Sequence, residues 1–148
     1  MTNEEAFTKL LKYCTYQERC HEEVRSKLIS LKVYGNDLEN VLSRLIEKDF
    51  LNEERYAKTY AGSKFRQMQW GKTKILHQLK FRKISDYCIR EAMKEIDNDD
   101  YLKTLQQQLE KRKKQVSSDK NWVHKTAQYL IGKGYEPDLV WKELQKEK

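Results

Sequence analysis

The chain has 148 residues, of which 38% are apolar and 36% charged, and its formal net charge is +7. This composition is polar for a compact globule and predicts an elongated shape with a large exposed surface. One proline, five glycines and few β-branched runs leave little to interrupt helices, so the composition favours an all-α fold over sheet-based classes.

The sequence also argues against a membrane or secreted protein. No apolar run approaches the length needed to cross a bilayer, and the N-terminal MTNEEAFTKLLKY lacks the basic start and apolar core of a leader peptide. Cys14, Cys20 and Cys88 are odd in number and have no recognised ligand spacing, and a metal site that included His21 would lack a fourth ligand nearby. We expect a cytoplasmic protein with reduced thiols, no metal and no cofactor.

The chain contains an internal repeat, because its apolar positions recur at a fixed offset of 51 residues without a gap. Three copies fit the chain length, and we place them at residues 1–51, 52–98 and 99–148, the second with a basic centre. The corresponding positions are Leu28, Leu79 and Leu130; Val33, Ile84 and Tyr135; Leu38, Ile89 and Val140; and Leu42, Met93 and Leu144. The sequence therefore predicts three tandem repeats in an elongated, curved array.

Each copy is expected to form three helices. In the first copy they cover Glu4–Tyr13, a second helix that starts at a capping box in Thr15–Glu18 and ends near Leu31, and a third that opens at Asn36 or Asp37 and ends near Asp49. In the second copy they cover Glu53–Gln67, Lys72–Arg82 and Ser85–Ile96, and in the third Asp99–Val116, Lys120–Ile131 and Pro137–Lys146.

The connection between the second and third helices has the spacing of a hydrophobic staple. Ile84 precedes Ser85, which suits the N-cap position, and Ile89 follows at the fourth helical position. Tyr135 and Val140 repeat this spacing around a proline at the first helical position. We predict that the three connections look alike. The resulting three-helix unit is also the outline of a helix-turn-helix module, although most such units are structural.

Positive charge is concentrated in the middle of the chain. The window from Arg55 to Lys83 holds nine basic side chains and no acidic one, so the rest of the chain carries about −2. Such a field attracts phosphate backbones or an acidic groove of a partner protein. A second, weaker basic cluster, Lys111–Lys114, surrounds its helix, and at least part of it must be solvated.

The segment from Arg66 to Lys83 is predicted to be largely helical, with two faces. Its apolar face must dock on a core and consists of Ile75, Leu76 and Leu79. The opposite face is expected to point outward and consists of Trp70, Lys74, His77 and Phe81. Aromatic and basic groups together suit stacking on bases or anchoring in a partner's groove. Alternatively, Trp70 and Phe81 pack against a neighbouring repeat.

These patterns give a set of candidate residues for binding a partner or DNA. The set combines the basic window with the second cluster and consists of Arg55, Lys64, Arg66, Trp70, Lys72, Lys74, His77, Lys80, Phe81, Arg82, Lys83, Lys111, Arg112, Lys113 and Lys114.

Catalytic and nucleotide-binding motifs are incomplete. Gly71-Lys72-Thr73 matches the end of a phosphate-binding loop, but the glycine that the motif requires five residues earlier is Arg66. The acidic run Asp97–Asp100 lacks the glycine and distal glutamate of a calcium loop and suits a helix start. The three histidines fall at different repeat registers, so we expect no enzyme.

The second repeat resembles the RecX family of bacterial recombination regulators. Leu51–Ala57 (LNEERYA) is similar to the family's LNDERYA, and the stretch from Trp70 to Ile84 is similar to its GxxRIxxELxxKGI. The resemblance extends to the first repeat through Arg19, Glu23, Val24, Lys27 and Leu28, and to the third through Leu130, Lys133, Gly134, Tyr135, Asp138 and Val140. The chain departs from the family pattern at Cys20, Glu53 and Lys83, which affects local capping and turn geometry.

The resemblance implies an all-helical protein that lies along the groove of the RecA–DNA filament and inhibits its ATP hydrolysis and strand exchange, as a modulator of DNA repair, recombination and the SOS response. The alternative is a direct DNA-binding protein with helix-turn-helix-like modules, whose contact with single- or double-stranded DNA would weaken with salt. We expect a monomer, because each repeat has neighbours on which to bury its apolar face.

Overall fold

The computed structural model describes residues 1–147, which form nine α-helices and no strand. The helices are α1 (Asn3–Tyr16), α2 (His21–Ser30), α3 (Gly35–Glu47), α4 (Glu53–Met68), α5 (Lys72–Phe81), α6 (Asp86–Met93), α7 (Asn98–Val116), α8 (Trp122–Gly132) and α9 (Pro137–Gln145). The predicted all-α fold of three tandem three-helix repeats is confirmed. The repeat boundaries stay predictions, and the last of them extends to Lys148, which lies outside the described residues.

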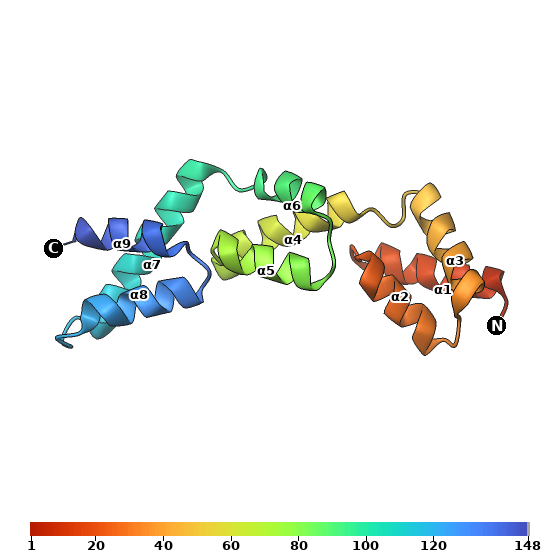
Figure 1. Cartoon of the computed structure of the whole chain (residues 1–148), viewed down its shortest axis with the longest axis horizontal. Helices are drawn as coiled ribbons and strands as arrows, with labels where there is room; N and C mark the ends of the chain where they lie inside the picture. Colours follow the sequence, from red (N-terminus) through yellow and green to blue (C-terminus); the bar gives the residue numbers. More distant parts are fainter. Residues whose placement is uncertain (148) are drawn as a thin grey trace.

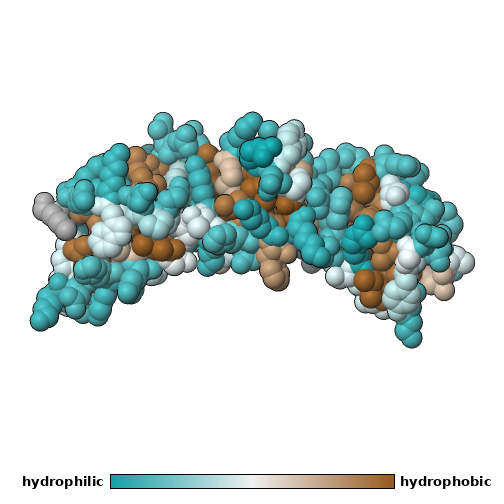
Figure 2. Space-filling view, viewed as in Figure 1, coloured by the Kyte–Doolittle hydropathy of each residue, from teal (hydrophilic) through white to brown (hydrophobic). Residues whose placement is uncertain are grey.

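The three repeats follow one another along the long axis of the molecule, with the two termini at opposite ends (Figure 1). The surface forms an arch that is hollowed along one long side (Figure 2). In the same view the second helix of each repeat, α2, α5 or α8, lies toward this concave side (Figure 1). Among residues 1–147, no helix is long and apolar enough to cross a membrane.

The connections between second and third helices are alike in all three repeats, as predicted. A residue with positive φ follows two positions after the end of each second helix, and these residues recur at the 51-residue period: Lys32, Lys83 and Gly134. The next residue then donates its backbone N–H to a carbonyl five positions earlier, as Ile84 does to Leu79 over 3.1 Å. Ile84 is buried and lies directly before Ser85, the N-cap residue of α6.

The staple predicted at the start of α6 is also present. Ser85 caps the helix by accepting a hydrogen bond from the backbone N–H of Cys88 at 3.2 Å, while Ile84 and Ile89 are both buried. Pro137 begins α9 after the N-cap Glu136, as predicted for the third repeat.

The predicted start of the second helix is wrong. Thr15 does not open a capping box but belongs to the last turn of α1, where its hydroxyl donates to the carbonyl of Lys12 at 3.1 Å. α2 begins at His21, and the reciprocal carboxylate is Glu23, which accepts the backbone N–H of Cys20 at 3.1 Å. Thr15 thus lies inside α1, which continues to Tyr16 beyond its predicted end at Tyr13.

The repeats differ in how they share a core. The first repeat has an apolar cluster of its own, formed by α1, α2 and α3 and including Leu28. The second and third repeats share one continuous cluster that runs from Tyr56 through Leu79 to Leu144. Cys20 is the buried residue of the first repeat that belongs to the shared cluster. Repeats 2 and 3 therefore form one packed unit, and repeat 1 packs as a separate one.

Backbone contacts reinforce the join between repeats 2 and 3. The N–H of Gly71 donates to the carbonyl of Lys133 at 2.8 Å, and the N–H of Thr73 donates to the carbonyl of Gly134 at 2.9 Å. The Tyr135 hydroxyl donates to the carbonyl of Gln69 at 2.8 Å. The first two bonds occupy the amides of Gly71 and Thr73, and the N–H of Lys72 donates to the Tyr101 hydroxyl at 2.9 Å. In a nucleotide-binding loop these amides would have to face a phosphate.

Candidate interaction surface

The turn before α5 changes the predicted position of Trp70. Gln69 adopts a left-handed conformation with φ of 53° and ends α4, so Arg66 to Lys83 is not one continuous helix. Trp70 therefore lies off the helical wheel of α5 and is half-buried against the shared core. Its ring meets that of Tyr60 edge-on, with the centroids 6.4 Å apart. The predicted outward orientation is wrong for Trp70.

Phe81 has the predicted outward orientation. It is the last residue of α5 and is 81% exposed, so it does not pack into a neighbouring repeat. It borders a surface hollow between the first two repeats that is also lined by Tyr13 and Lys27. The apolar face of α5 is turned inward as predicted, with Ile75 and Leu79 fully buried.

Some of the predicted binding residues are held by acidic groups of the same chain. The Arg55 guanidinium pairs with Glu18 at 2.7 Å and with Asp49 at 3.2 Å. The Lys83 ammonium lies 3.7 Å from Glu22. The pairs with Glu18 and Glu22 connect repeat 2 to repeat 1, so Arg55 and Lys83 stabilise the junction between these repeats.

Four cations of the basic window lie against aromatic rings and form no ion pair within residues 1–147. The distances from the charged group to the ring centre are 5.5 Å for Lys64 on Tyr60, 4.6 Å for Lys72 on Tyr101, 4.5 Å for Lys74 on Trp70 and 4.8 Å for Arg82 on Tyr60. Such contacts fix the position of the side chain without neutralising its charge. Lys72 also donates to the side-chain oxygen of Asn98 at 3.2 Å.

The remaining predicted residues of the window, Arg66, His77 and Lys80, are exposed. We refer to Lys72, Lys74, His77, Lys80 and Phe81 as the α5 surface. It combines cations that lack acidic partners in the described chain with one exposed aromatic ring. The helix that carries this surface, α5, lies toward the concave side of the arch (Figure 1).

The second basic cluster is not brought together with the α5 surface. α7 starts near repeat 2 and runs away from it, so the turns that carry Lys111 and Lys114 lie at the far end of the molecule (Figure 1). These two lysines are exposed. Arg112 lies 4.7 Å from the ring centre of Tyr129, and Lys113 lies 3.9 Å from the Glu147 carboxylate.

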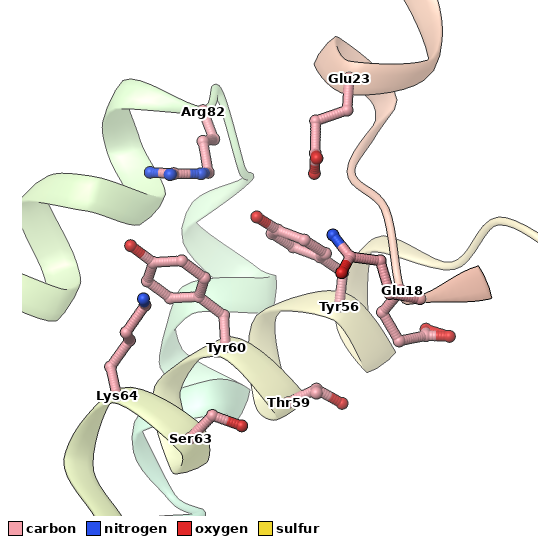
Figure 3. Close-up of a pocket in the computed structure, with 9 residues that line it drawn as sticks. Glu18, Glu23, Tyr56, Thr59, Tyr60, Ser63, Lys64 and Arg82 are labelled. Atoms are coloured by element: carbon pink, nitrogen blue, oxygen red, sulfur yellow. The ribbon is translucent and has the colours of Figure 1, made fainter. Parts of the chain in front are cut away.

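A cavity of about 410 Å³ lies at the junction of repeats 1 and 2 (Figure 3). Its walls come from α4, from Arg82 after α5, and from the first repeat, and the lining includes Glu23, Tyr56 and Tyr60. The two tyrosines were not predicted as candidates. A usable signal was present, because Tyr56, Tyr60 and Lys64 follow at four-residue intervals and so share one helix face.

The buried cysteines are not reactive groups at neutral pH. Burial raises the pKa of Cys14 and of Cys20 to about 11, so both thiols stay protonated. No group of three or more histidine, cysteine, aspartate or glutamate side chains within residues 1–147 is arranged to hold a metal ion.

Comparison with known proteins identifies the family. Models of RecX domains match two stretches of the chain, the second three-helix domain at residues 52–93 and the third at residues 99–144, and together they cover more than half of it. The regulatory protein RecX of Bacillus mycoides is 26% identical over 150 residues, which is 98% of this chain and 56% of that relative. The RecX of Bacillus licheniformis is 26% identical over 141 residues, with 94% and 54% covered. The chain thus spans about half the length of these curated relatives.

Solved structures agree with this assignment. The crystal structure of RecX from Lactobacillus salivarius matches with a TM-score of 0.88 at 25% identity, covering 97% of this chain and 95% of that one. A second crystal structure, of a regulatory protein RecX, has the same fold, with a TM-score of 0.87 at 18% identity over 97% of this chain and 71% of the other. The domain matches, the relatives and the fold all agree, and the chain belongs to the RecX family of regulatory proteins.

Proposed function

We propose that this protein regulates the RecA recombinase by binding the filament that RecA forms on DNA, and that bound protein inhibits ATP hydrolysis and strand exchange. The observation that carries the proposal is the α5 surface, together with membership of a family of regulatory proteins. Its cations lack acidic partners within residues 1–147, and Phe81 offers an exposed aromatic anchor beside them.

The shape supports a filament as the partner. A groove binder needs to touch several subunits in succession, and an arch built from repeats presents its second helices in a row (Figure 1). The shared core of repeats 2 and 3 keeps α5 and α8 in a fixed relation, which lowers the entropy lost on binding.

In this proposal the protein acts by binding, without catalysis or a cofactor, as a monomer in the cytoplasm. The candidate residues at the junction and on α7 then have different roles. Arg55 and Lys83 hold the first two repeats together, whereas Lys111 and Lys114 offer a secondary contact for acidic or phosphate groups.

Binding to recombinase-coated DNA, compared with bare DNA, tests the proposal. We expect much tighter binding to the RecA filament on single-stranded DNA than to the same DNA alone. Equal affinity for both would favour the direct DNA-binding alternative, in which affinity falls with salt at a log–log slope of about −0.7 per neutralised phosphate on single strands.

A further inference from the structure

The cavity between repeats 1 and 2 brings together hydrogen-bond donors from repeat 2, namely Arg82, Tyr56 and Tyr60, across from the carboxylates of Glu18 and Glu23 in repeat 1 (Figure 3). The Tyr56 hydroxyl points toward the space between Arg82 and Glu23, and the Tyr60 ring lies between Arg82 and Lys64 (Figure 3). Within residues 1–147, neither tyrosine hydroxyl forms a hydrogen bond with another side chain.

The donors keep their protons at neutral pH. Burial raises the pKa of Tyr56 and of Tyr60, so both remain hydroxyls. The Arg82 guanidinium uses one nitrogen, Nη1, to donate to the backbone and side-chain oxygens of Gln78, both at 3.0 Å. The rest of its donor edge makes no ion pair within the described chain, which leaves it available for an anion.

The opposite wall carries two carboxylates, and each of them already interacts with groups of the same chain. Glu18 accepts from Arg55 at 2.7 Å, and Glu23 accepts from the backbone N–H of Cys20 and lies 3.6 Å from Arg19. Both carboxylates therefore already have a cation of this chain as a neighbour. Their charge disfavours any anion that comes close to them. A nucleic acid strand, with a phosphate at every nucleotide, is disfavoured more than a single carboxylate that approaches from the side of Arg82 and Lys64 (Figure 3).

We propose that the junction cavity receives an aspartate or glutamate side chain from a protein segment of the partner, held by Arg82 and by the hydroxyls of Tyr56 and Tyr60. A carboxylate offers two acceptor oxygens, which match this set of donors, and the tyrosines orient it as Arg82 neutralises it. This inference rests on the proposed function, because the segment belongs to the recombinase in the filament.

Removal of the two hydroxyls tests the inference without emptying the cavity. The double variant Tyr56→Phe with Tyr60→Phe keeps both rings, and we expect it to bind the RecA filament roughly tenfold more weakly, because hydrogen bonds to a charged group are lost. Its thermal midpoint and its affinity for bare single-stranded DNA should match those of the wild type. The matched control, Tyr34→Phe with Tyr87→Phe, removes two exposed hydroxyls elsewhere and should leave filament binding unchanged.

Arg82→Gln gives a second readout with the same expected pattern and a larger loss of filament affinity. Unchanged filament binding by the tyrosine double variant and by Arg82→Gln would overturn the inference while leaving the proposed function intact. A parallel loss on bare DNA would also overturn it, because the cavity would then hold a phosphate. If the wild type itself does not prefer the filament over bare DNA, the proposed function fails and the inference falls with it.

Discussion

Gly71 and Gly134 meet where repeats 2 and 3 join, and neither position has room for a side chain. A Cβ on Gly71 would lie 2.2 Å from the carbonyl carbon of Gly134 and from the backbone nitrogen of Tyr135. Gly134 has a φ of 105°, which side chains of L residues rarely allow. The glycine of the phosphate-loop-like string therefore serves close backbone packing between two repeats.

Gly71→Ala is expected to lower the free energy of unfolding by about 1–3 kcal/mol, because the backbone of repeat 3 must move away to accept the methyl group. Gly132→Ala is the matched control, since a Cβ there meets nothing within 4 Å. It lies in the last turn of α8 and should be neutral or stabilise by up to about 1 kcal/mol. Urea denaturation compares the two variants, and equal midpoints would contradict this account of the interface.

Leu79 and Phe81 lie two residues apart on α5 and should respond in opposite ways. Leu79→Ala removes a fully buried side chain and should cost about 2–5 kcal/mol of stability. Phe81→Ala with Lys80→Glu changes exposed groups, so stability should move by no more than about 0.5 kcal/mol for each change while filament binding is lost. Thermal unfolding and filament binding measure the two effects. A large fall in the midpoint of the exposed variant would show that Phe81 belongs to a core.

The sequence suggests that Lys72→Glu with Lys74→Glu would change the surface charge alone, but in the structure both side chains also contribute to packing. Both ammonium groups lie over aromatic rings, and the Cβ of Lys74 lies close to Gly134. Reversal of these charges removes two cation–π contacts, each worth about 0.5–1 kcal/mol at an exposed site. The variant therefore affects the fold as well as the binding surface.

At the scale of the elements, the two junctions between repeats have different physical bases. Repeats 2 and 3 share apolar core and backbone hydrogen bonds, whereas repeats 1 and 2 meet through ion pairs, the junction cavity and the buried Cys20. Ion pairs at a surface are weakened by salt, while apolar burial is not. The first junction should therefore open more readily.

Alkylation of the cysteines reports on this difference. Cys20 and Cys14 are both buried, but Cys20 lies at the junction and Cys14 lies in the core of repeat 1. Arg55→Gln removes the pairs with Glu18 and Asp49 and should speed the alkylation of Cys20, measured by peptide mass spectrometry. Alkylation of Cys14 should not become faster, because the Arg55 charge lowers the pKa of that thiol and its removal acts in the opposite direction. Because both thiols have a pKa near 11, the comparison needs a fixed pH. Equal acceleration at both cysteines would indicate loss of stability in all of repeat 1.

The helices could be predicted from the sequence where local signals repeat. The 51-residue period located the buried leucines Leu28, Leu79 and Leu130, and the similar connections between second and third helices followed from the staple spacing. The end of α4 was predicted to within one residue, at Gln67 where the helix ends at Met68. The left-handed conformation of Gln69, which takes Trp70 off the wheel of α5, could not be predicted because Gln69 is not a residue type that favours it. The capping box predicted at Thr15 was wrong because a hydroxyl between two helices can either cap the start of the second helix or donate to a carbonyl of the first.

The sequence predicts how many basic residues the candidate surface holds, but not which of them are paired with acidic residues of the same chain. The basic window is visible in the sequence, but Glu18 and Glu22, which neutralise Arg55 and Lys83, come from another repeat. Their approach depends on how the repeats are arranged in space. The junction cavity was missed for the same reason, because its walls come from three separate parts of the chain, within residues 17–23, within residues 56–64 and at Arg82.

At the scale of the whole molecule, shape and charge act together. The arch places the second helices of the repeats toward one hollowed side, and the basic window contributes α5 at its middle (Figures 1 and 2). A surface of this kind steers an acidic or nucleic-acid-coated partner toward its centre before specific contacts form. Filament association should therefore slow as ionic strength rises, and this dependence should weaken when Lys80 is replaced by glutamate.

The proposed inhibition of the RecA filament is tested most directly by ATP hydrolysis of the cognate RecA on single-stranded DNA, titrated with the wild-type protein. We expect hydrolysis to fall progressively as the protein approaches stoichiometric amounts, and the variant Lys80→Glu with Phe81→Ala to leave hydrolysis near its uninhibited rate. Hydrolysis that stays at the uninhibited rate with stoichiometric wild-type protein would contradict the claim.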